Sequence, residues 1–408
     1  MTAVESAMGC DSILGVPAGT LDEGFEAEFQ ALISAAQAPP DPKVPSATDR
    51  LLSALRTVRS PTLQKWFWPD AKPFCVALSH DVDEIRWSWR RRLLMAARHP
   101  STIFARNDRY WNFERVLNLE RRYGVRSSWF FVADGSHPRD PPYHLEDVRD
   151  AIRLVMQAGN EVGLHGSFLS YNDSSRMQRE REAICRAVGG PVLGVRQHFL
   201  NFDPLRTWKI QESAGFAYDS TLAFNEVSGF RTGMCHPYYP PGHSILEIPL
   251  VLMDGQLFWY ERLGVPEAIS NSERLANEVI RRNGLLTLNW HQHTYDEYSF
   301  PGWWRVYEHM LRWLSERSAL FLPCGEIARW WAQRDGVSVR LQREGDHGRT
   351  WTILSTEPVR GLTVRAVGMP AAGFDADVPY HVVSLAGENM LVLEELRPNV
   401  PAVVTTSS

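Results

Sequence analysis

The chain has 408 residues, of which 44% are hydrophobic and 22% are charged, and these proportions are those of an ordinary globular protein. The formal net charge is -5, so the composition offers no basic footprint for binding nucleic acid. No apolar run is long enough to cross a membrane.

The N-terminus and the cysteines bear on cellular location. Residues 1–19 lack a basic region followed by an apolar core, so they do not resemble a secretory signal. The five cysteines are widely separated, and none has the spacing of a metal knuckle. Reduced thiols are the simplest account of them, and we therefore expect a cytoplasmic protein.

Residues 1–70 are expected to form a helical cap. Apolar residues recur with helical spacing over residues 25–36 and 47–58. The proline-rich segment 38–42 lies between them and predicts a linker. We expect this cap to pack on the domain that follows and to carry no separate function.

The next predicted element is a buried strand over residues 74–78, which leads into His80, Asp81, Val82 and Asp83. Alternate residues of a strand share a face, so Asp81 and Asp83 can point into one cavity while His80 points the other way. Paired carboxylates at a strand end suit a metal ligand beside a proton-transfer base. Aspartate is also common in turns, so this pattern alone leaves both interpretations open.

Further apolar runs resemble strands and carry or precede polar side chains with chemical uses. They cover residues 129–132 before Asp134, 161–165 ending in His165, 194–198 with Arg196 and His198, 246–254 ending in Asp254, and 285–291 ending in His291. Amphipathic segments alternate with them, at 113–123, 145–158, 175–188, 204–214 and 266–282. This alternation predicts an α/β fold with a parallel sheet or barrel, whose active site lies at the C-terminal ends of the strands.

From about residue 334 the pattern changes to short segments that alternate apolar and polar residues, at 337–341, 350–354, 362–366 and 381–385. This texture predicts antiparallel strands and a small β-rich domain over residues 334–408. We expect this domain to cover the barrel or to mediate contacts in a homo-oligomer, rather than to bind substrate. The final residues, 398–408, are expected to fray.

The motifs of the middle segment, taken in order, resemble those of the NodB-type polysaccharide deacetylase family. They are Asp81-Val82-Asp83, the run from Gly159 to His165, the strand with Arg196, and the late strand that ends in His291. The run from Gly215 to Thr221 is also similar to a stretch common in that family. The similarity spans residues 72–332, so we assign residues 71–333 to this domain. It implies a distorted (β/α)7 barrel that removes acetyl groups from N-acetyl sugars with a bound divalent metal.

The resemblance also implies catalytic roles. Asp81 matches the general base that activates water, and Arg196 matches the arginine that orients that base. His291 matches the histidine that protonates the leaving amine. Asp254 is a looser match to the acid that holds this histidine in the correct tautomer.

The metal ligands depart from the family pattern at one position. Asp83 and His165 match two family ligands, but the second histidine of the family's His-x-x-x-His pair is replaced here by Leu169, which cannot bind a metal. The arginine strand also departs, because it continues into Gln197 and His198 instead of Pro-Tyr. We therefore predict that His198 supplies the missing imidazole and that Asp83, His165 and His198 hold the metal, with zinc favoured. The other interpretation is that His198 only packs and that the metal is weak or absent.

Three residues are candidates for contacting the substrate. The backbone amide of Phe199 is a candidate for stabilising the oxyanion. Trp290 and Tyr171 are candidates for the cleft wall, since aromatic faces suit sugar CH surfaces. The segment 293–297 is expected to be a solvated turn.

Two hypotheses from different classes remain. The first is a metal-dependent hydrolase that removes acetyl from an N-acetylated sugar or sugar-like compound, and a cyclic-amide hydrolase on the same barrel differs from it only in substrate. The second is a degenerate, non-catalytic relative that binds a glycan or scaffolds other proteins, and Leu169 is its best support. A base and an acid across one cavity favour the hydrolase, because a pure binder has no physical need for them.

Overall fold

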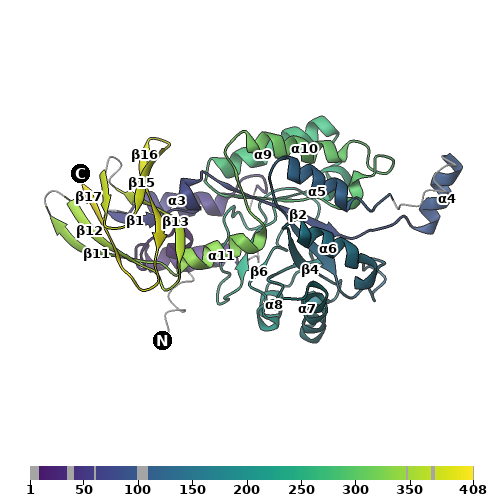
Figure 1. Ribbon diagram of the computed structural model, residues 1–408, viewed down its shortest axis with the longest axis horizontal. Coiled ribbons are helices and arrows are strands. Elements are labelled where there is room, and N and C mark those ends of the chain that lie inside the picture. Colours follow the sequence, from purple (N-terminus) through teal and green to yellow (C-terminus); the bar gives the residue numbers. More distant parts are fainter. Residues whose placement is uncertain are drawn as a thin grey trace.

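The computed structural model describes residues 9–34, 41–58, 61–98, 109–345, 348–368 and 373–407. Two parts lie side by side along the long axis (Figure 1). One is a curved sheet covered by helices, and the other is a β-rich module formed mainly by the last part of the chain. The expected linker over residues 38–42 lies partly outside the described residues.

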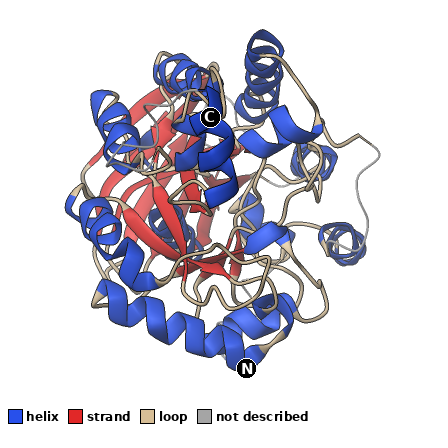
Figure 2. Ribbon diagram, turned by 90° about the vertical axis from the view of Figure 1, so that its right-hand side faces the viewer, coloured by secondary structure: helices blue, strands red, loops and turns tan. Residues whose placement is uncertain are grey.

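The curved sheet consists of parallel strands. They are β2 (Cys75–Val82), β3 (Ser128–Val132), β4 (Glu161–Gly166), β5 (Gly194–Gln197), β6 (Tyr218–Asp219), β7 (Leu246–Glu247), β8 (Leu252–Met253), β9 (Leu285–Asn289) and β10 (Leu320–Phe321). Their order is β7-β6-β5-β4-β3-β2-β9-β8, with β10 also paired to β2. Viewed along the molecule, the strands curl around a centre with helices outside them (Figure 2). The predicted α/β fold with a distorted (β/α)7 barrel is confirmed.

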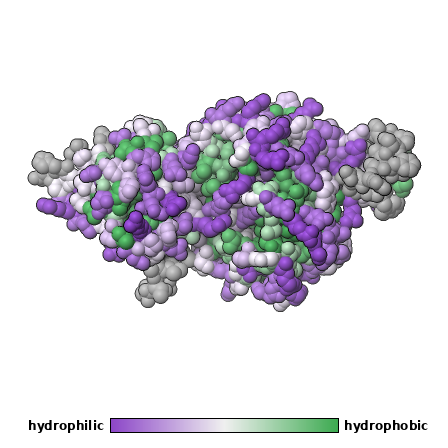
Figure 3. Space-filling view, in the orientation of Figure 1, coloured by the Kyte–Doolittle hydropathy of each residue, from purple (hydrophilic) through white to green (hydrophobic). Residues whose placement is uncertain are grey.

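The helices around the sheet form where the sequence is amphipathic. They are α5 (Phe113–Arg122), α6 (Arg149–Gln157), α7 (Ser174–Val188), α8 (Thr207–Ala214), α9 (Val265–Ile280), α10 (Trp303–Ser315) and α11 (Cys324–Asp335). In α5, for example, Phe113, Val116 and Leu117 are buried at the spacing of one helix face. Hydrophilic side chains cover much of the outer surface over these helices, with hydrophobic residues between them (Figure 3).

The N-terminal segment contains the two expected helices, α2 (Glu23–Ile33) and α3 (Ser46–Arg56). It also contains a short helix, α1 (Cys10–Leu14), and a strand that were not expected. Strand β1 (Thr62–Lys65) pairs antiparallel with β13 (Val359–Val367) of the C-terminal module. The prediction that this segment is only helix and linker is therefore incomplete. Local sequence patterns could not predict β1, because the strand with which it pairs lies almost at the other end of the chain.

The C-terminal module has the predicted antiparallel strands. They are β11 (Ser338–Gly345), β12 (Gly348–Leu354), β13, β14 (Gly373–Ala376), β15 (Tyr380–Leu385), β16 (Glu388–Leu396) and β17 (Ala402–Ser407). Together with β1 they form two four-stranded sheets, ordered β1-β13-β16-β15 and β11-β12-β17-β14. The expectation that residues 398–408 fray is wrong, because β17 is paired on both sides, with β12 and with β14.

Arg334 joins the parts of the molecule. Its guanidinium is fully buried at the end of α11 and donates to the carbonyls of Ser12, Ile13, Lys65 and Trp66. These acceptors belong to the N-terminal helices and to the region of β1, so one side chain fixes both to the barrel. Buried carbonyls need hydrogen-bond partners, and the Arg334 guanidinium supplies one to each of the four.

Replacing Arg334 with methionine should therefore destabilise the protein by about 3–5 kcal/mol, because several buried carbonyls and the neighbouring Asp335 lose their positive partner. Urea unfolding followed by tryptophan fluorescence measures this change. Arg360→Ala is the control, since Arg360 is exposed and pairs with Glu395, which is also exposed. Its effect should stay within about 0.5 kcal/mol. Equal stability of the two variants would contradict the role assigned to Arg334.

Candidate active site

Most of the predicted site residues meet around one cavity at the C-terminal ends of the strands. Its volume is ≈ 530 Å³. Asp81 lies in β2, and Asp83 is the first residue after this strand. His165 lies in β4, and His291 is the second residue after β9. All four line the cavity, together with His198. The parallel strands thus deliver their polar ends to a common edge, as the sequence pattern predicts.

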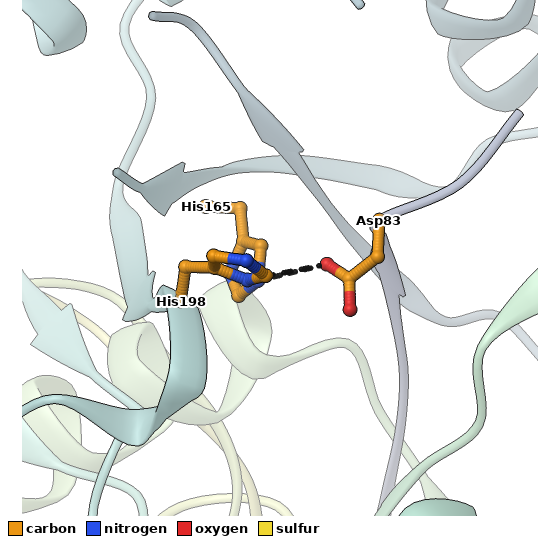
Figure 4. A group of neighbouring side chains, drawn as sticks. All are labelled: Asp83, His165 and His198. Carbon is orange, nitrogen blue, oxygen red and sulfur yellow. Dashed lines mark hydrogen bonds and ion pairs between the residues drawn. The ribbon is translucent and has the colours of Figure 1, made fainter. Parts of the chain in front are cut away.

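Asp83, His165 and His198 form the group with the geometry of a metal site (Figure 4). One ligand atom from each lies within 4.8 Å of the others. The Oδ1 atom of Asp83 is 3.3 Å from Nε2 of His165 and 3.4 Å from Nδ1 of His198. The same two ring nitrogens are 3.1 Å apart. Three protein ligands with space beside them match the number found in catalytic zinc sites.

The outer nitrogen of each histidine is held by a backbone carbonyl. Nδ1 of His165 lies 2.9 Å from the carbonyl oxygen of Arg196, and Nε2 of His198 lies 2.9 Å from that of Arg139. A carbonyl only accepts, so each of these nitrogens carries a proton and donates. The two remaining nitrogens therefore face each other with lone pairs when the rings are neutral. Such carbonyl contacts are typical of histidines that bind metals.

This donor set fits a divalent cation. Two imidazole lone pairs and a carboxylate converge, and their close approach needs a positive charge between them. Oδ1 of Asp83 is buried and has no hydrogen-bond partner among the described residues. Nitrogen and carboxylate ligands together suit zinc among the common metals.

Asp81 is held as an ionised carboxylate. Its Oδ1 accepts from Nη1 of Arg196 at 2.9 Å, and its Oδ2 accepts from Nδ2 of Asn289 at 2.8 Å. Burial alone would raise the pKa of Asp81, but the charges of Arg196 and of the nearby imidazoles outweigh it and hold that pKa below its usual range. Sequence reasoning missed Asn289, although it precedes His291 by two residues in one extended segment.

Arg196 is itself fixed on all sides. Nη1 also donates to the hydroxyl of Ser79, and Nη2 and Nε donate to the hydroxyl and the carbonyl of Ser220. The guanidinium carbon lies 4.6 Å from the ring centre of Phe130. A fully buried arginine with all these partners has little freedom to move.

His291 and Asp254 form a second buried pair. Oδ1 of Asp254 is 2.6 Å from Nδ1 of His291, and Oδ2 accepts from the His291 amide at 3.0 Å. Thr294 also donates to this carboxylate through its hydroxyl. Burial would lower the pKa of His291, but the charges of Asp254 and Asp83 outweigh it and raise that pKa well above its usual range. The pair leaves Nε2 of His291 toward the cavity as a proton donor.

The two aromatic residues that were expected to line the cleft, Trp290 and Tyr171, do not line the cavity. Trp290 is fully buried beside Phe258 and Tyr307, so the prediction that it lines the cleft is wrong. Neither Trp290 nor Tyr171 is among the described residues that line the cavity. Strand alternation explains the first case, because Trp290 follows Asn289 and precedes His291 and so points to the other side.

Other aromatic residues line the cavity instead. Phe168, Phe199, Trp259 and Tyr260 belong to its wall, and Phe199, Trp259 and Tyr260 are about half exposed. Trp259 and Tyr260 lie in a π-helical segment, Gln256–Tyr260, that directly follows Asp254 and Gly255. A π-helical turn has no clear sequence signal, which is why these two residues were missed. Phe199, the predicted oxyanion residue, has a left-handed backbone with φ 58°.

The segment over residues 293–297 also differs from the expected solvated turn. It begins in a short 3-10 helix, Gln292–Tyr295, whose residues are buried. His293 lines the cavity, and its ring centre lies 5.3 Å from that of His291. Its burial follows from the aromatic residues around it, which include Tyr110 and Phe300.

Glu180 of α7 fixes the loop after β4, which begins two residues after His165. Its carboxyl accepts from the amide of Ser167 at 3.1 Å and also from the hydroxyl of Ser167. Burial raises the pKa of Glu180 to about 7. Between its ordinary value of 4.5 and about 7 the folded protein thus binds a proton that the unfolded chain has lost. This group therefore makes the protein less stable as the pH rises through that window.

Glu180→Gln should remove this part of the pH dependence, because glutamine keeps a carbonyl acceptor for Ser167 and carries no charge. Relative to wild type, the variant should gain unfolding free energy as the pH rises from 4.5 to 7. Urea unfolding over this pH range measures the difference. Glu182→Gln, at an exposed position of the same helix, is the control and should follow the wild-type slope. Parallel curves for all three proteins would contradict the assignment.

Comparison with known proteins gives matches to solved structures alone. No family model and no curated protein matches this chain. A Mycobacterium smegmatis protein described as a polysaccharide deacetylase has 20% identity and a TM-score of 0.49, covering 69% of this chain and 98% of its own. A Pseudomonas aeruginosa PAO1 protein described in the same way has 16% identity and a TM-score of 0.48, covering 65% of this chain and 92% of its own. A CE4 family pseudoenzyme from Bacillus anthracis, BA3943, has 13% identity and a TM-score of 0.36, covering 64% and 66%. The solved structures that this chain resembles are thus polysaccharide deacetylases and CE4 family members, all at low identity.

Proposed function

We propose that this protein is a metal-dependent amide hydrolase that removes an acetyl group from an N-acetylated sugar or a sugar-like compound. One observation carries the proposal. A three-residue ligand group, an ionised carboxylate and a protonated histidine face one cavity from different strands. Each of these parts has a role in amide hydrolysis, and together they have no evident role in simple binding.

A divalent metal held by Asp83, His165 and His198 would polarise the amide carbonyl and make water more acidic. Asp81 is the base that takes the proton from the attacking water. Its lowered pKa keeps it ionised, and Arg196 and Asn289 aim it by holding both carboxylate oxygens. The backbone amide of Phe199, at the cavity wall, is the candidate donor to the developing oxyanion.

His291 is the acid that protonates the departing nitrogen. Its Nδ1 donates to Asp254, and its raised pKa keeps the ring doubly protonated, so Nε2 carries a proton that can be transferred. Asp254 also accepts from the His291 amide and from Thr294, which fixes the ring. The base thus comes from β2, and the acid follows the neighbouring strand β9. The reaction requires both, because one proton is removed and another is donated.

The cavity wall supports a sugar-like substrate. Half-exposed Trp259 and Tyr260 lie on one element, Phe168 lies in the segment after β4, and Phe199 lies in a short 3-10 helix, His198–Leu200. Aromatic faces beside polar groups are a common way to bind the CH faces of a sugar ring. The volume of ≈ 530 Å³ is that of a site for one compact group rather than for a long polymer.

Metal analysis of purified variants tests the ligand group. Wild type should carry about one equivalent of a divalent metal, and Asp83→Ala, His165→Ala and His198→Ala should each lose most of it. His381→Ala is the matched control, since His381 lies in β15 of the C-terminal module. Retention of metal by His198→Ala alone would mean that another residue is the third ligand. Absence of metal in reconstituted wild type would contradict the proposed mechanism and favour the non-catalytic binding protein.

Two further substitutions separate catalysis from metal binding. Asp81→Asn and Asp254→Asn should keep the metal, because neither residue belongs to the ligand group. Each should lower kcat for release of acetate from an N-acetylated sugar by about 10²–10⁴-fold, since the base or the orienting acid is lost. Metal content and acetate release are measured on the same samples. Full activity of Asp81→Asn would rule out its role as base.

A further inference from the structure

The π-helical segment Gln256–Tyr260, which supplies half-exposed aromatic residues to the cavity wall, is fixed at both of its ends. At the start, the carboxamide of Gln256 accepts from the amide of Met253 at 2.8 Å and donates to the carbonyl of Phe224. At the end, the amide of Glu261 donates to the carbonyl of Gln256 at 2.8 Å. π-helical turns are rare and are frequently found at functional sites. The contacts at its two ends therefore decide where this part of the wall lies.

The contact at the end of the segment comes from the N-terminal part of the chain. Nζ of Lys43 donates to Oε1 of Glu261 at 2.5 Å and to the hydroxyl of Ser228 at 2.7 Å. The Ser228 amide donates to the same carboxylate at 2.9 Å, and Asn271 of α9 also donates to it. The side chains of Lys43 and Glu261 are only 20% and 14% exposed. Loss of the lysine would thus leave a mostly buried carboxylate without its counter-charge.

The backbone beside Lys43 is fixed as well. The carbonyl of Pro42 accepts from the amide of Phe230 at 2.7 Å. Gly229 has a φ of 145°, and a Cβ at this position would lie 2.0 Å from the Pro42 carbonyl oxygen, so only glycine fits there. On the other side, the amide of Lys43 donates to the carboxylate of Asp41 at 2.8 Å. The lysine is therefore held against the loop that contains Ser228 by its backbone and its side chain together.

We propose that Lys43 is a positioning residue for the substrate, which fixes Glu261 and thereby the place of Trp259 and Tyr260 in the cavity wall. The inference rests on the proposed function, because it assigns these two aromatic residues to a sugar-like substrate. Lys43 is not among the described residues that line the cavity, so it acts through Glu261. The groups of the chemical step lie on other elements, so Lys43 affects substrate binding and not the chemical step. The N-terminal segment then takes part in substrate recognition.

Amide hydrogen exchange followed by mass spectrometry tests the contact without reference to catalysis. In full-length Lys43→Met, a peptide over residues 255–263 should exchange at least about tenfold faster than in wild type, while peptides over β4 and β9 keep their wild-type rates. Glu261→Gln is the second variant, because it removes the ion pair and leaves no buried charge on the carboxyl side. It should accelerate exchange in the same peptide. Lys43→Arg should restore slow exchange, since a guanidinium can still pair with Glu261.

Steady-state kinetics tests whether the contact serves the substrate. With N-acetylglucosamine as the probe, Lys43→Met and Glu261→Gln should each raise KM at least about fivefold and leave kcat within about twofold of wild type. Lys209→Met is the matched control, because Lys209 is exposed on α8, and it should leave both constants unchanged. An ion pair with a structural role alone would lower the urea midpoint without changing KM or the exchange of residues 255–263. That result, or a fall in kcat at constant KM, would overturn the proposal.

The two measurements keep this proposal distinct from the proposed function. If wild type released no acetate, the hydrolase would be contradicted, and binding of N-acetylglucosamine measured by calorimetry would replace KM. That binding should weaken by the same factor in both variants, and equal binding by all proteins would overturn the role of Lys43. Acetate release by wild type with unchanged KM and exchange in both variants would support the hydrolase and overturn this proposal alone.

Discussion

The buried ion pair between Arg196 and Asp81 is the interaction on which the rest of the site depends. Both groups are nearly or fully inaccessible to solvent. Bringing them out of water is unfavourable, and an arginine without its carboxylate would be an uncompensated buried charge. Ser79, Ser220 and Asn289 occupy the remaining positions around the pair, so its desolvation is offset by hydrogen bonds. The result is a carboxylate that stays ionised and does not rotate.

The same strand that supplies Arg196 also supplies a metal-site contact. The Arg196 carbonyl accepts from His165, while its side chain holds Asp81 on the other side of the strand. One residue therefore sets both the tautomer of His165 and the direction of the Asp81 carboxylate. Arg196 can make both contacts because β5 lies directly beside β4 in the parallel sheet, with Arg196 in register with His165.

Much of the site could be predicted from the sequence because its residues sit at strand ends. Periodicity finds buried strands, and a parallel sheet brings their ends together whatever the length of the connections. The proximity of His198 to Asp83 and His165 could be inferred for this reason, since it follows Arg196 by two residues. Asn289 was missed because an asparagine at a strand end has many uses, and nothing local marks it as the partner of Asp81.

The errors share a different cause. Trp290 was assigned to the cleft from its neighbour His291, but strand alternation turns adjacent residues to opposite sides. Trp259 and Tyr260 depend on a π-helical turn, and the burial of His293 depends on aromatic residues far away in sequence. Local patterns carry little information on such contacts, because tertiary packing decides them.

The pairing of β1 with β13 has a consequence for how the chain folds. Thr62 lies opposite Val367, so the first strand of the protein is completed by one of the last segments to be made. On a ribosome, β1 must wait with an unpaired edge while the whole barrel is synthesised and folds between the two partners. Contacts of such long sequence separation form slowly. Closure of the C-terminal module is therefore expected to be the final step of folding, and the waiting edge of β1 is the point at which a nascent chain is most exposed to aggregation.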